Sequence, residues 1–370
     1  MILAHLSLIN FKNYAEAAFD FDPNVNIFTG LNGQGKTNIL DAIHYLAFCK
    51  SYFNPIDSQN VRHGEEFFVV EGIFDNKEVH DKIYCGVKKG QKKVFRKNKT
   101  EYERLAEHIG KYPAVVISPY DKDLISDGSE MRRKLMDSII SQYNRAYLED
   151  LIDYNKLLRQ RNSLLKYFWE NRTFDADNLE VWTIQLVEVA KRIHAERKNF
   201  VAQFEPVFLA HYAAISGNAE DVALEYTSHL STGDFSDTMT ASLEKDRRSS
   251  YTNVGTHKDD LKFKIGGHPL KKFGSQGQQK TYLISLKLAQ FDLIKETTKR
   301  VPILLLDDIF DKIDDVRVQH LMKLVSDHNF GQIFITDTHS ERIAHIFEGI
   351  SDSAKIFTIK EGEIYEPQRK

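Results

Sequence analysis

Cysteine is scarce in this chain: Cys49 and Cys85 are the only two among 370 residues, and they lie far apart. This spacing indicates neither a disulfide scaffold nor a cysteine-based metal site. Long apolar runs are also missing, since no stretch approaches the ~18 consecutive apolar residues of a membrane span. The polar start lacks the apolar core of a secretory signal, and the fourteen histidines form no H-E-x-x-H pair. We therefore expect a cytoplasmic protein that does not enter a membrane.

The chain also lacks an excess of either charge, because its formal net charge is only −3. This balance excludes a nucleic-acid binder that is basic over its whole surface, so any contact with DNA must use a local patch. Repeats and low-complexity tracts are absent as well. The composition is that of an ordinary globular protein, 42% hydrophobic and 28% charged, and the length predicts two or three domains.

A candidate phosphate-binding loop lies near the start and matches the pattern G-x-x-x-x-G-K-[ST]. Its residues are Gly30, Leu31, Asn32, Gly33, Gln34, Gly35, Lys36 and Thr37. The glycines allow a tight turn in which successive N–H groups face phosphate oxygens. Lys36 supplies a cation for the β- and γ-phosphates, and the Thr37 hydroxyl is a ligand for Mg²⁺. A β-prone segment precedes the loop and a helical apolar pattern follows it, so the order predicts a site for ATP and Mg²⁺.

Acidic residues that would complete this site lie far along the chain. Residues 303–306 form an unbroken apolar run, as expected for a strand buried on both faces of a parallel sheet, and Asp307 and Asp308 follow it. Asp307 is placed to hold Mg²⁺. Asp308 could polarise the attacking water, so we take Asp308 and Lys36 as the catalytic residues. The intervening residues are too many for a loop, so they must form a structure inserted into one nucleotide-binding head.

A second candidate phosphate site precedes another helical pattern. Ser275, Gly277 and Gln278 stand just before apolar residues that recur at helical spacing from Tyr282 to Leu293. Helix N-termini bind anions. One chain cannot easily present this segment and the phosphate-binding loop to the same γ-phosphate. The sequence therefore predicts that the segment acts in trans, on the ATP of a second copy.

These segments together resemble the ABC-type ATPases of the SMC group, and most closely the RecF family of bacterial DNA replication and repair proteins. Besides the loop, the resemblance rests on the Ser-Gln-Gly-Gln-Gln and Leu-Leu-Leu-Asp-Asp segments and on residues 10–14, 118–133 and 254–261. It spans nearly the whole chain. It implies a homodimer with ATP sandwiched between Lys36 of one copy and Ser275 of the other. It also implies DNA binding near single-strand/double-strand junctions, recombinase loading with RecO and RecR, and roles in gap repair and the SOS response.

The chain departs from the family pattern in a few places. Residues 311–314 read Asp-Lys-Ile-Asp where family members usually carry Ser-Glu-Leu-Asp, and the reversed charge at Lys312 is expected to change dimer contacts. His339 is a candidate γ-phosphate switch, with a solvated histidine at a strand exit as the alternative. Gln59 is the nearest candidate for the γ-phosphate-sensing glutamine. Because Asp308 is shorter than the glutamate of many ABC ATPases, we expect slow hydrolysis.

The densest basic segment, residues 88–99, carries seven positive charges in twelve residues. Turn-forming residues between short β-prone pieces predict a projecting hairpin. One interpretation is a solvated sheet edge protected by lysine. The resemblance favours the other, which is contact with DNA. The DNA-binding candidates are Lys88, Lys89, Lys92, Lys93, Arg96 and Lys97, with residues 132–134 and 271–272 as weaker ones.

The middle of the chain is predicted to be helical. Apolar residues recur at spacings of three and four from Tyr147 to Phe168, and again from Trp182 to Phe204. Two antiparallel helices of about thirty residues would form an arm of roughly 40 Å, and Pro206 should kink or end the second. The alternative is an ordinary helical subdomain that packs against the head. Residues 222–226 are a strand candidate.

We therefore expect an α/β protein: an ABC-type P-loop ATPase head with a mixed sheet and flanking helices, and an inserted, mainly helical lobe with a short antiparallel arm. The head should comprise residues 1–120 and 250–370, and the inserted lobe residues 121–249. The expected function is ATP-dependent dimerisation, DNA binding and slow hydrolysis in DNA repair and replication. The alternative is a related ATPase in which ATP acts only as a structural glue of the dimer. A transporter ATPase subunit is disfavoured by the long insert.

Overall fold

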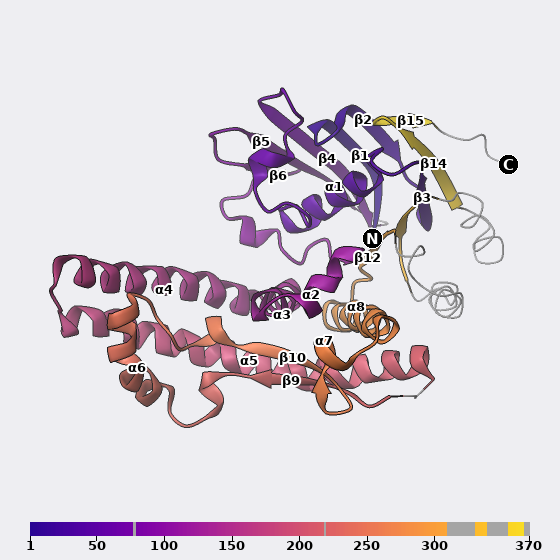
Figure 1. The fold of residues 1–370 in the computed structure, drawn as a ribbon. Helices are drawn as coiled ribbons and strands as arrows, with labels where there is room; N and C mark the ends of the chain where they lie inside the picture. The colour runs from indigo at the N-terminus through magenta and orange to yellow at the C-terminus, as the bar shows by residue number, and fades with distance from the viewer. Residues whose placement is uncertain (77–78, 218–219, 309–329, 339–353, 366–370) are drawn as a thin grey trace. The chain divides into compact units, whose positions relative to one another are not determined.

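The computed structural model describes residues 1–76, 79–217, 220–308, 330–338 and 354–365 (Figure 1). The chain forms two compact units. The first unit comprises Met1–Asp121 and Leu286–Lys370, and the second unit comprises Lys122–Ser285. Both ends of the chain therefore contribute to the first unit, and the middle forms the second.

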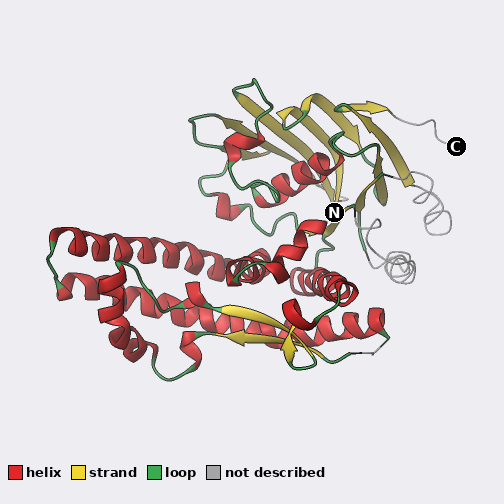
Figure 2. Cartoon of the chain, in the orientation of Figure 1, coloured by secondary structure: helices red, strands yellow, loops and turns green. Residues whose placement is uncertain are grey.

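The first unit contains two six-stranded sheets, drawn in yellow in Figure 2. One has the order β2-β1-β4-β5-β6-β7, and its neighbouring strands are antiparallel. Its strands are β1 (Ile2–Phe11), β2 (Tyr14–Asp20), β4 (Phe67–Asn76), β5 (Val79–Lys88), β6 (Val94–Lys97) and β7 (Thr100–Glu101). The predicted basic hairpin corresponds to the end of β5, the turn after it and β6.

The other sheet of the first unit has the order β15-β14-β3-β13-β12-β8 and is parallel except for its edge strand β15. Its strands are β3 (Val25–Thr29), β8 (Ala114–Ile117), β12 (Ile303–Asp307), β13 (Ile333–Asp337), β14 (Ala354–Lys360) and β15 (Glu363–Tyr365). All residues of β3 and β12 are buried, as the unbroken apolar run predicted for β12. Parallel strands bring their carboxyl ends to one edge of the sheet, and β3 and β12 are followed there by the phosphate-binding loop and the paired acids.

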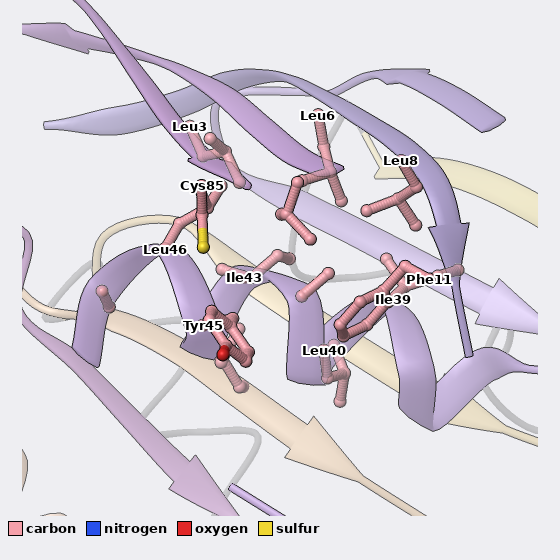
Figure 3. Packing of buried hydrophobic residues seen from close by; sticks show 14 of the residues in the cluster. Leu3, Leu6, Leu8, Phe11, Ile39, Leu40, Ile43, Tyr45, Leu46 and Cys85 are labelled. Carbon is pink, nitrogen blue, oxygen red and sulfur yellow. The ribbon is translucent and has the colours of Figure 1, made fainter. Parts of the chain in front are cut away.

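Helix α1 (Lys36–Phe48) packs against strands of both sheets. Its apolar side chains occur at i, i+3, i+4 and i+7, and they face Leu3, Leu6 and Leu8 of β1 (Figure 3). Eleven of its thirteen residues are buried. A helix that is buried nearly all round holds its N-terminus firmly, which fixes the loop that precedes it.

The second unit is mainly helical, with one small antiparallel sheet of order β11-β10-β9. Its helices are α2 (Asp123–Ser126), α3 (Ser129–Tyr143), α4 (Arg145–Asn171), α5 (Ala176–Ser216), α6 (Phe235–Ser249) and α7 (Leu270–Phe273), and its strands are β9 (Val222–Thr227), β10 (Asp260–Ile265) and β11 (His268–Pro269). Helix α8 (Gln276–Thr298) begins in the second unit and continues into the first. Short 3-10 helices occupy Asp57–Asn60, Leu105–Glu107, Pro119–Lys122, His229–Ser231 and Thr256–Lys258.

Helices α4 and α5 lie side by side and correspond to the two predicted arm helices (Figure 1). They contain 27 and 41 residues rather than about thirty each. Pro206 does not end the second helix: it lies inside α5, which continues to Ser216. The strand candidate at residues 222–226 is confirmed as β9.

The chain re-enters the first unit later than the sequence indicated. The expected return lies at residue 250, whereas residues 250–285 belong to the second unit. The physical reason is the pairing of β10 with β9, which runs from Asp260↔Thr227 to Ile265↔Val222. Strand pairing across the intervening α6 was not visible in the local pattern.

Buried ion pairs hold the second unit together. Arg161 pairs with Asp246 at 2.8 Å, and both side chains are almost fully buried. Arg197 pairs with Asp259 at 2.7 Å and with Asp137 at 2.9 Å. Removing one partner of such a pair leaves an uncompensated buried charge and costs about 3–5 kcal/mol.

Among the described residues, no helix combines the length and the apolar character that crossing a bilayer requires.

Two buried histidines make the stability of the first unit dependent on pH. Burial lowers the pKa of His44 and of His108 from 6.5 to about 4. The unfolded chain therefore binds these protons at a higher pH than the folded chain does. Stability should be fully present above pH 6.5 and fall towards pH 4, by about 1.4 kcal/mol per pH unit for each histidine.

Urea unfolding followed by circular dichroism at pH 7 and pH 5 tests this expectation. His108→Phe removes one titrating group and should reduce the loss of stability between the two pH values. His63→Phe, at an exposed position of the first unit, is the matched control and should keep the wild-type dependence. An unchanged pH dependence in His108→Phe would contradict the assignment.

Candidate functional site

The phosphate-binding loop connects β3 to α1, and its backbone explains two of its glycines. Gly30 has φ +143°, and a Cβ there would lie 2.3 Å from the carbonyl oxygen of Ile359 in β14. Gly35 has φ +111°, and its Cβ would lie 2.3 Å from the Asn13 side chain. No larger residue fits at either position. Lys36 is buried, and its Nζ donates to the carbonyl oxygens of Gly30 at 2.7 Å and of Leu31 at 3.1 Å.

The loop is held from outside by the turn between β1 and β2. Asn13 Nδ2 donates to the carbonyl oxygen of Gln34 at 2.9 Å, and Asn13 Oδ1 accepts from Asn38 Nδ2 at 2.7 Å. Tyr14 Oη donates to the carbonyl oxygen of Gly35 at 3.1 Å. The side chains of Asn13 and Tyr14 thus donate hydrogen bonds to two backbone carbonyl groups of the loop. This turn belongs to residues 10–14, one of the segments that resemble the RecF family, and its contact with the loop was not predicted.

Asp307 joins the two distant halves of the site. Thr37 Oγ1 donates to its Oδ1 at 2.7 Å, and Thr336 Oγ1 donates to the same oxygen at 2.9 Å. Ser118 Oγ donates to Oδ2 at 3.2 Å. Asp307 is 3% exposed, and this burial raises the pKa of its carboxyl, although the three hydroxyls and Lys36 act in the opposite direction. The predicted pairing of the loop with the first of the two acids is therefore present in the geometry.

Ser118 and Thr336 are site residues that the sequence reasoning did not identify. Ser118 follows β8, and Thr336 lies in β13, so both stand at the carboxyl edge of the parallel sheet beside Asp307. The sequence feature that could have indicated them is a polar residue at or just after the end of a short apolar strand. Ser118 is itself fixed, because its backbone N–H donates to Asp121 Oδ2 at 2.8 Å. Asp121 forms a buried ion pair with Lys287 of α8 at 2.7 Å.

The oxygen atoms at this site suit Mg²⁺ as it is bound in nucleotide sites of other proteins. A hard cation prefers oxygen ligands, and Mg²⁺ is usually held by one or two carboxylates together with substrate phosphates and waters. Thr37 Oγ1 and Asp307 supply a hydroxyl and a carboxylate side by side. Within the described part of the chain, no cluster of three or more His, Cys, Asp or Glu side chains could hold a metal by itself.

Asp308, the expected catalytic acid, follows β12 with an unusual backbone. Its φ is +44°, a left-handed value that costs energy for a residue other than glycine. Its N–H donates to Thr336 Oγ1 at 3.0 Å. The candidate switch His339 and residues 311–314 lie outside the described residues. Gln59 lies in the 3-10 helix Asp57–Asn60, where its Oε1 accepts from Asn54 Nδ2 at 3.0 Å.

Ser275 and Gln278 form a reciprocal cap at the start of α8. Gln278 N–H donates to Ser275 Oγ at 3.2 Å, and Ser275 N–H donates to Gln278 Oε1 at 2.7 Å. This is a capping box, which satisfies two backbone donors at once. Gln278 Nε2 also donates to Glu220 Oε1 at 2.9 Å. Ser275 and Gly277 lie in the second unit, whereas the phosphate-binding loop and Asp307 lie in the first.

The basic segment divides into engaged and exposed side chains. Lys93 Nζ is bound to Asp57 at 2.8 Å and to the carbonyl oxygen of Cys49, and Lys97 pairs with Asp81 at 2.7 Å. Their charges are neutralised within the first unit, which weakens them as DNA candidates. The exposed members are Lys88, Lys89, Lys92, Arg96 and Lys99. Of these, Lys89 Nζ donates to the carbonyl oxygen of Glu65 at 2.6 Å, and Arg96 lies 3.8 Å from a carboxylate oxygen of Glu101.

An open pocket adjoins the exposed lysines. It has a volume of about 710 Å³, and Lys12, Arg62, His63 and Lys89 line it together with neutral residues. Of the weaker candidates, Arg132 pairs bidentately with Asp260, and Arg133 donates to the carbonyl oxygen of Asp259. These contacts join residues 132–133 to residues 259–260 within the second unit, so both arginines are engaged in contacts inside that unit.

Known proteins resemble the whole chain. The sequence model of the RecF/RecN/SMC N terminal domain matches residues 2–363. DNA replication and repair protein RecF of Flavobacterium johnsoniae is 51% identical over 97% of this chain and 100% of its own length. The same-named protein of Phocaeicola vulgatus is 48% identical, covering 99% of this chain and 98% of its own.

Solved structures agree with this result. The structure of the recombination mediator protein RecF with ATP, in the RecFOR pathway, aligns with a TM-score of 0.90 at 30% identity and covers 99% of this chain and 98% of that one. A Pyrococcus furiosus Smc head domain aligns at 17% identity with a TM-score of 0.56, over 98% of this chain and 95% of its own, and shares the fold. The predicted ABC-type ATPase fold is confirmed, and the chain belongs to the RecF family of DNA replication and repair proteins.

Proposed function

We propose that this chain binds ATP and Mg²⁺, dimerises on ATP with the nucleotide between two copies, binds DNA and hydrolyses ATP slowly. The observation that carries the proposal is the contact of Thr37 with Asp307, which joins the phosphate-binding loop to the strand from the far end of the chain. We further propose that it supports recombinase loading with RecO and RecR in gap repair and in the SOS response, and membership of the RecF family supports this proposal. A cytoplasmic location goes with this role.

Different residues of the first unit would bind the phosphates, hold Mg²⁺ and activate the attacking water. The loop N–H groups and Lys36 would bind the phosphates, and Thr37 and Asp307 would hold Mg²⁺, which neutralises phosphate charge when bound. Ser118 and Thr336 keep the Asp307 carboxylate oriented through their hydroxyls. Asp308 would polarise the attacking water. Asn13 and Tyr14 hold the loop in shape before the nucleotide arrives.

Lys36→Ala tests the nucleotide site. The substitution removes the cation that faces the β- and γ-phosphates, so ATP affinity should fall by at least about a hundredfold, equivalent to roughly 3 kcal/mol for a charged hydrogen bond. Isothermal titration calorimetry with ATP and Mg²⁺ measures the change. Lys50→Ala, at an exposed lysine just after α1, is the control and should bind as wild type. Equal affinity in Lys36→Ala and wild type would remove the basis of the proposal.

Ser275 tests the site in trans. Ser275→Arg should abolish ATP-dependent dimerisation while each monomer still binds ATP, because the bulky side chain would stand where the partner's γ-phosphate belongs. Ser275→Asp keeps an acceptor for the helix cap but places a negative charge against the phosphate, so it should fail in the same way. Sedimentation velocity with ATP measures the dimer, and thermal unfolding verifies the cap. A normal dimer in both variants would contradict the composite site.

The exposed lysines of the basic segment are proposed to contact the DNA backbone. Lys88→Ala, Lys89→Ala and Lys92→Ala together should weaken binding to all sequences alike. The slope of log affinity against log salt should flatten by up to roughly 2.7 units on duplex DNA. Lys97→Ala is the control, because its charge already pairs with Asp81. DNA affinity across a salt series, with ATP present, gives both slopes; parallel lines for the triple variant and wild type would assign the segment to a solvated edge.

A further inference from the structure

The far end of the α4–α5 pair carries aromatic and arginine side chains that the proposed ATP chemistry does not use. It lies at the left in Figure 1, where α4 ends, α5 begins and α6 packs beside them. An open pocket of about 760 Å³ is found there, in the size range of pockets that hold drug-sized ligands. Its walls include Phe168, Trp169, Arg172, Phe174, Arg247 and Arg248. We call this pocket and its walls the arm tip.

The arm tip is a rigid platform. Leu165, Phe168 and Leu179 form a small buried cluster beneath it. Arg172 ends α4 in the left-handed region with φ +52°, and its N–H donates to the carbonyl oxygens of Phe168 and Trp169. Asp175 caps α5 by accepting from the Asn178 N–H at 3.0 Å. The turn between the two helices is therefore fixed at both ends before any ligand binds.

Two aromatic rings at the arm tip are accessible. Trp169 is 62% exposed, and Phe174 is 36% exposed. Phe174 packs edge-on against Phe168 with centroids 5.5 Å apart, and the Arg247 guanidinium lies 4.1 Å from its ring centroid. These contacts orient Phe174, and the Arg247 guanidinium covers one face of its ring, so a base can stack only on the other face. Large exposed aromatics in fixed positions are the usual means of stacking unpaired nucleic-acid bases.

The charges at the arm tip leave an excess of arginine. Lys166 pairs with Glu170 at 3.7 Å, and Arg247 pairs with Glu244 at 2.7 Å, so both carboxylates of the pocket wall are compensated. Arg172 and Arg248 form no ion pair with any residue that the structure describes. Arg172 also occupies a left-handed position where glycine or asparagine is usual. The uncompensated charge of the pocket is therefore positive and favours an anionic partner.

We propose that the arm tip binds single-stranded DNA, with bases stacked on Trp169 and Phe174 and with phosphates paired to Arg172 and Arg248. Duplex DNA keeps its base faces covered, so only a single strand can use both kinds of group. An acidic peptide could use the arginines but offers no series of flat faces for the two rings. This inference rests on the proposed DNA binding and adds a second contact surface, formed by the second unit alone.

The experiment uses Trp169 as its own reporter. The chain has two tryptophans, Trp169 and Trp182, so Trp182→Phe leaves Trp169 as the only one. The full-length protein is titrated with an oligothymidylate in the Lys88→Ala, Lys89→Ala, Lys92→Ala background, which removes the three lysines proposed to contact DNA from the first unit. Stacking should quench Trp169 fluorescence saturably. A matched duplex of the same length should quench it at least tenfold less effectively.

Variants then separate stacking from charge. Trp169→Ala should weaken binding of a labelled oligothymidylate, measured by anisotropy, by about five- to a hundredfold, the range for one stacked base. Arg172→Asn with Arg248→Gln should flatten the salt slope by up to about 1.4 units, because each phosphate contact on a single strand contributes about 0.7. Asparagine tolerates the left-handed position of Arg172. Arg145→Ala, at the other end of α4 and paired with Glu149, should leave the affinity unchanged.

The outcomes distinguish this inference from the proposed function. If the otherwise wild-type protein binds no DNA of any form, the proposed DNA binding fails and the arm tip inference fails with it. A second outcome is that the otherwise wild-type protein binds DNA while the oligothymidylate leaves Trp169 fluorescence unchanged and the Arg172→Asn, Arg248→Gln variant keeps the wild-type salt slope. That result overturns only the arm tip inference. Quenching by an acidic peptide but not by the oligothymidylate would also overturn it and would assign the arm tip to a protein partner.

Discussion

The organisation of the first unit depends on one buried carboxylate. Asp307 accepts hydrogen bonds from Thr37 after the phosphate-binding loop, from Ser118 after β8 and from Thr336 in β13. Three segments that are far apart in the sequence therefore meet at one side chain. A carboxylate that is buried among neutral hydroxyls is costly, and a bound cation would lower that cost. We therefore propose that this arrangement favours the binding of Mg²⁺ together with a nucleotide.

This constraint explains why the inserted unit can be so large. Parallel strands bring the start of α1 and the end of β12 to the same edge of the sheet, whatever lies between them in the chain. Lys122–Ser285 can then form a separate unit with its own buried ion pairs, Arg161 with Asp246 and Arg197 with Asp259. Helix α8, which starts with the Ser275 cap, is the segment through which the chain passes from one unit to the other.

The sequence predicted the features that local pattern determines. The phosphate-binding loop, the apolar strand before Asp307 and the two long helices each carry a period or motif that can be read within a short window. It did not predict that Ser118 and Thr336 would meet Asp307, because that contact depends on which strands are neighbours in the sheet. It also could not separate exposed Lys88 from engaged Lys93, since the partner Asp57 lies in a different segment. Pro206 lies within α5, so the local preference of proline did not end this helix.

We propose that ATP joins two copies through the phosphate-binding loop of one and the Ser275 segment of the other. Multi-angle light scattering of the wild-type protein, with and without ATP and with and without a gapped DNA, measures the mass that this proposal requires. We expect a monomer mass without nucleotide, twice that mass with ATP, and retention of the dimer on the gapped DNA while ATP persists. A mass that does not change with ATP, in the presence or absence of DNA, would rule out the shared site.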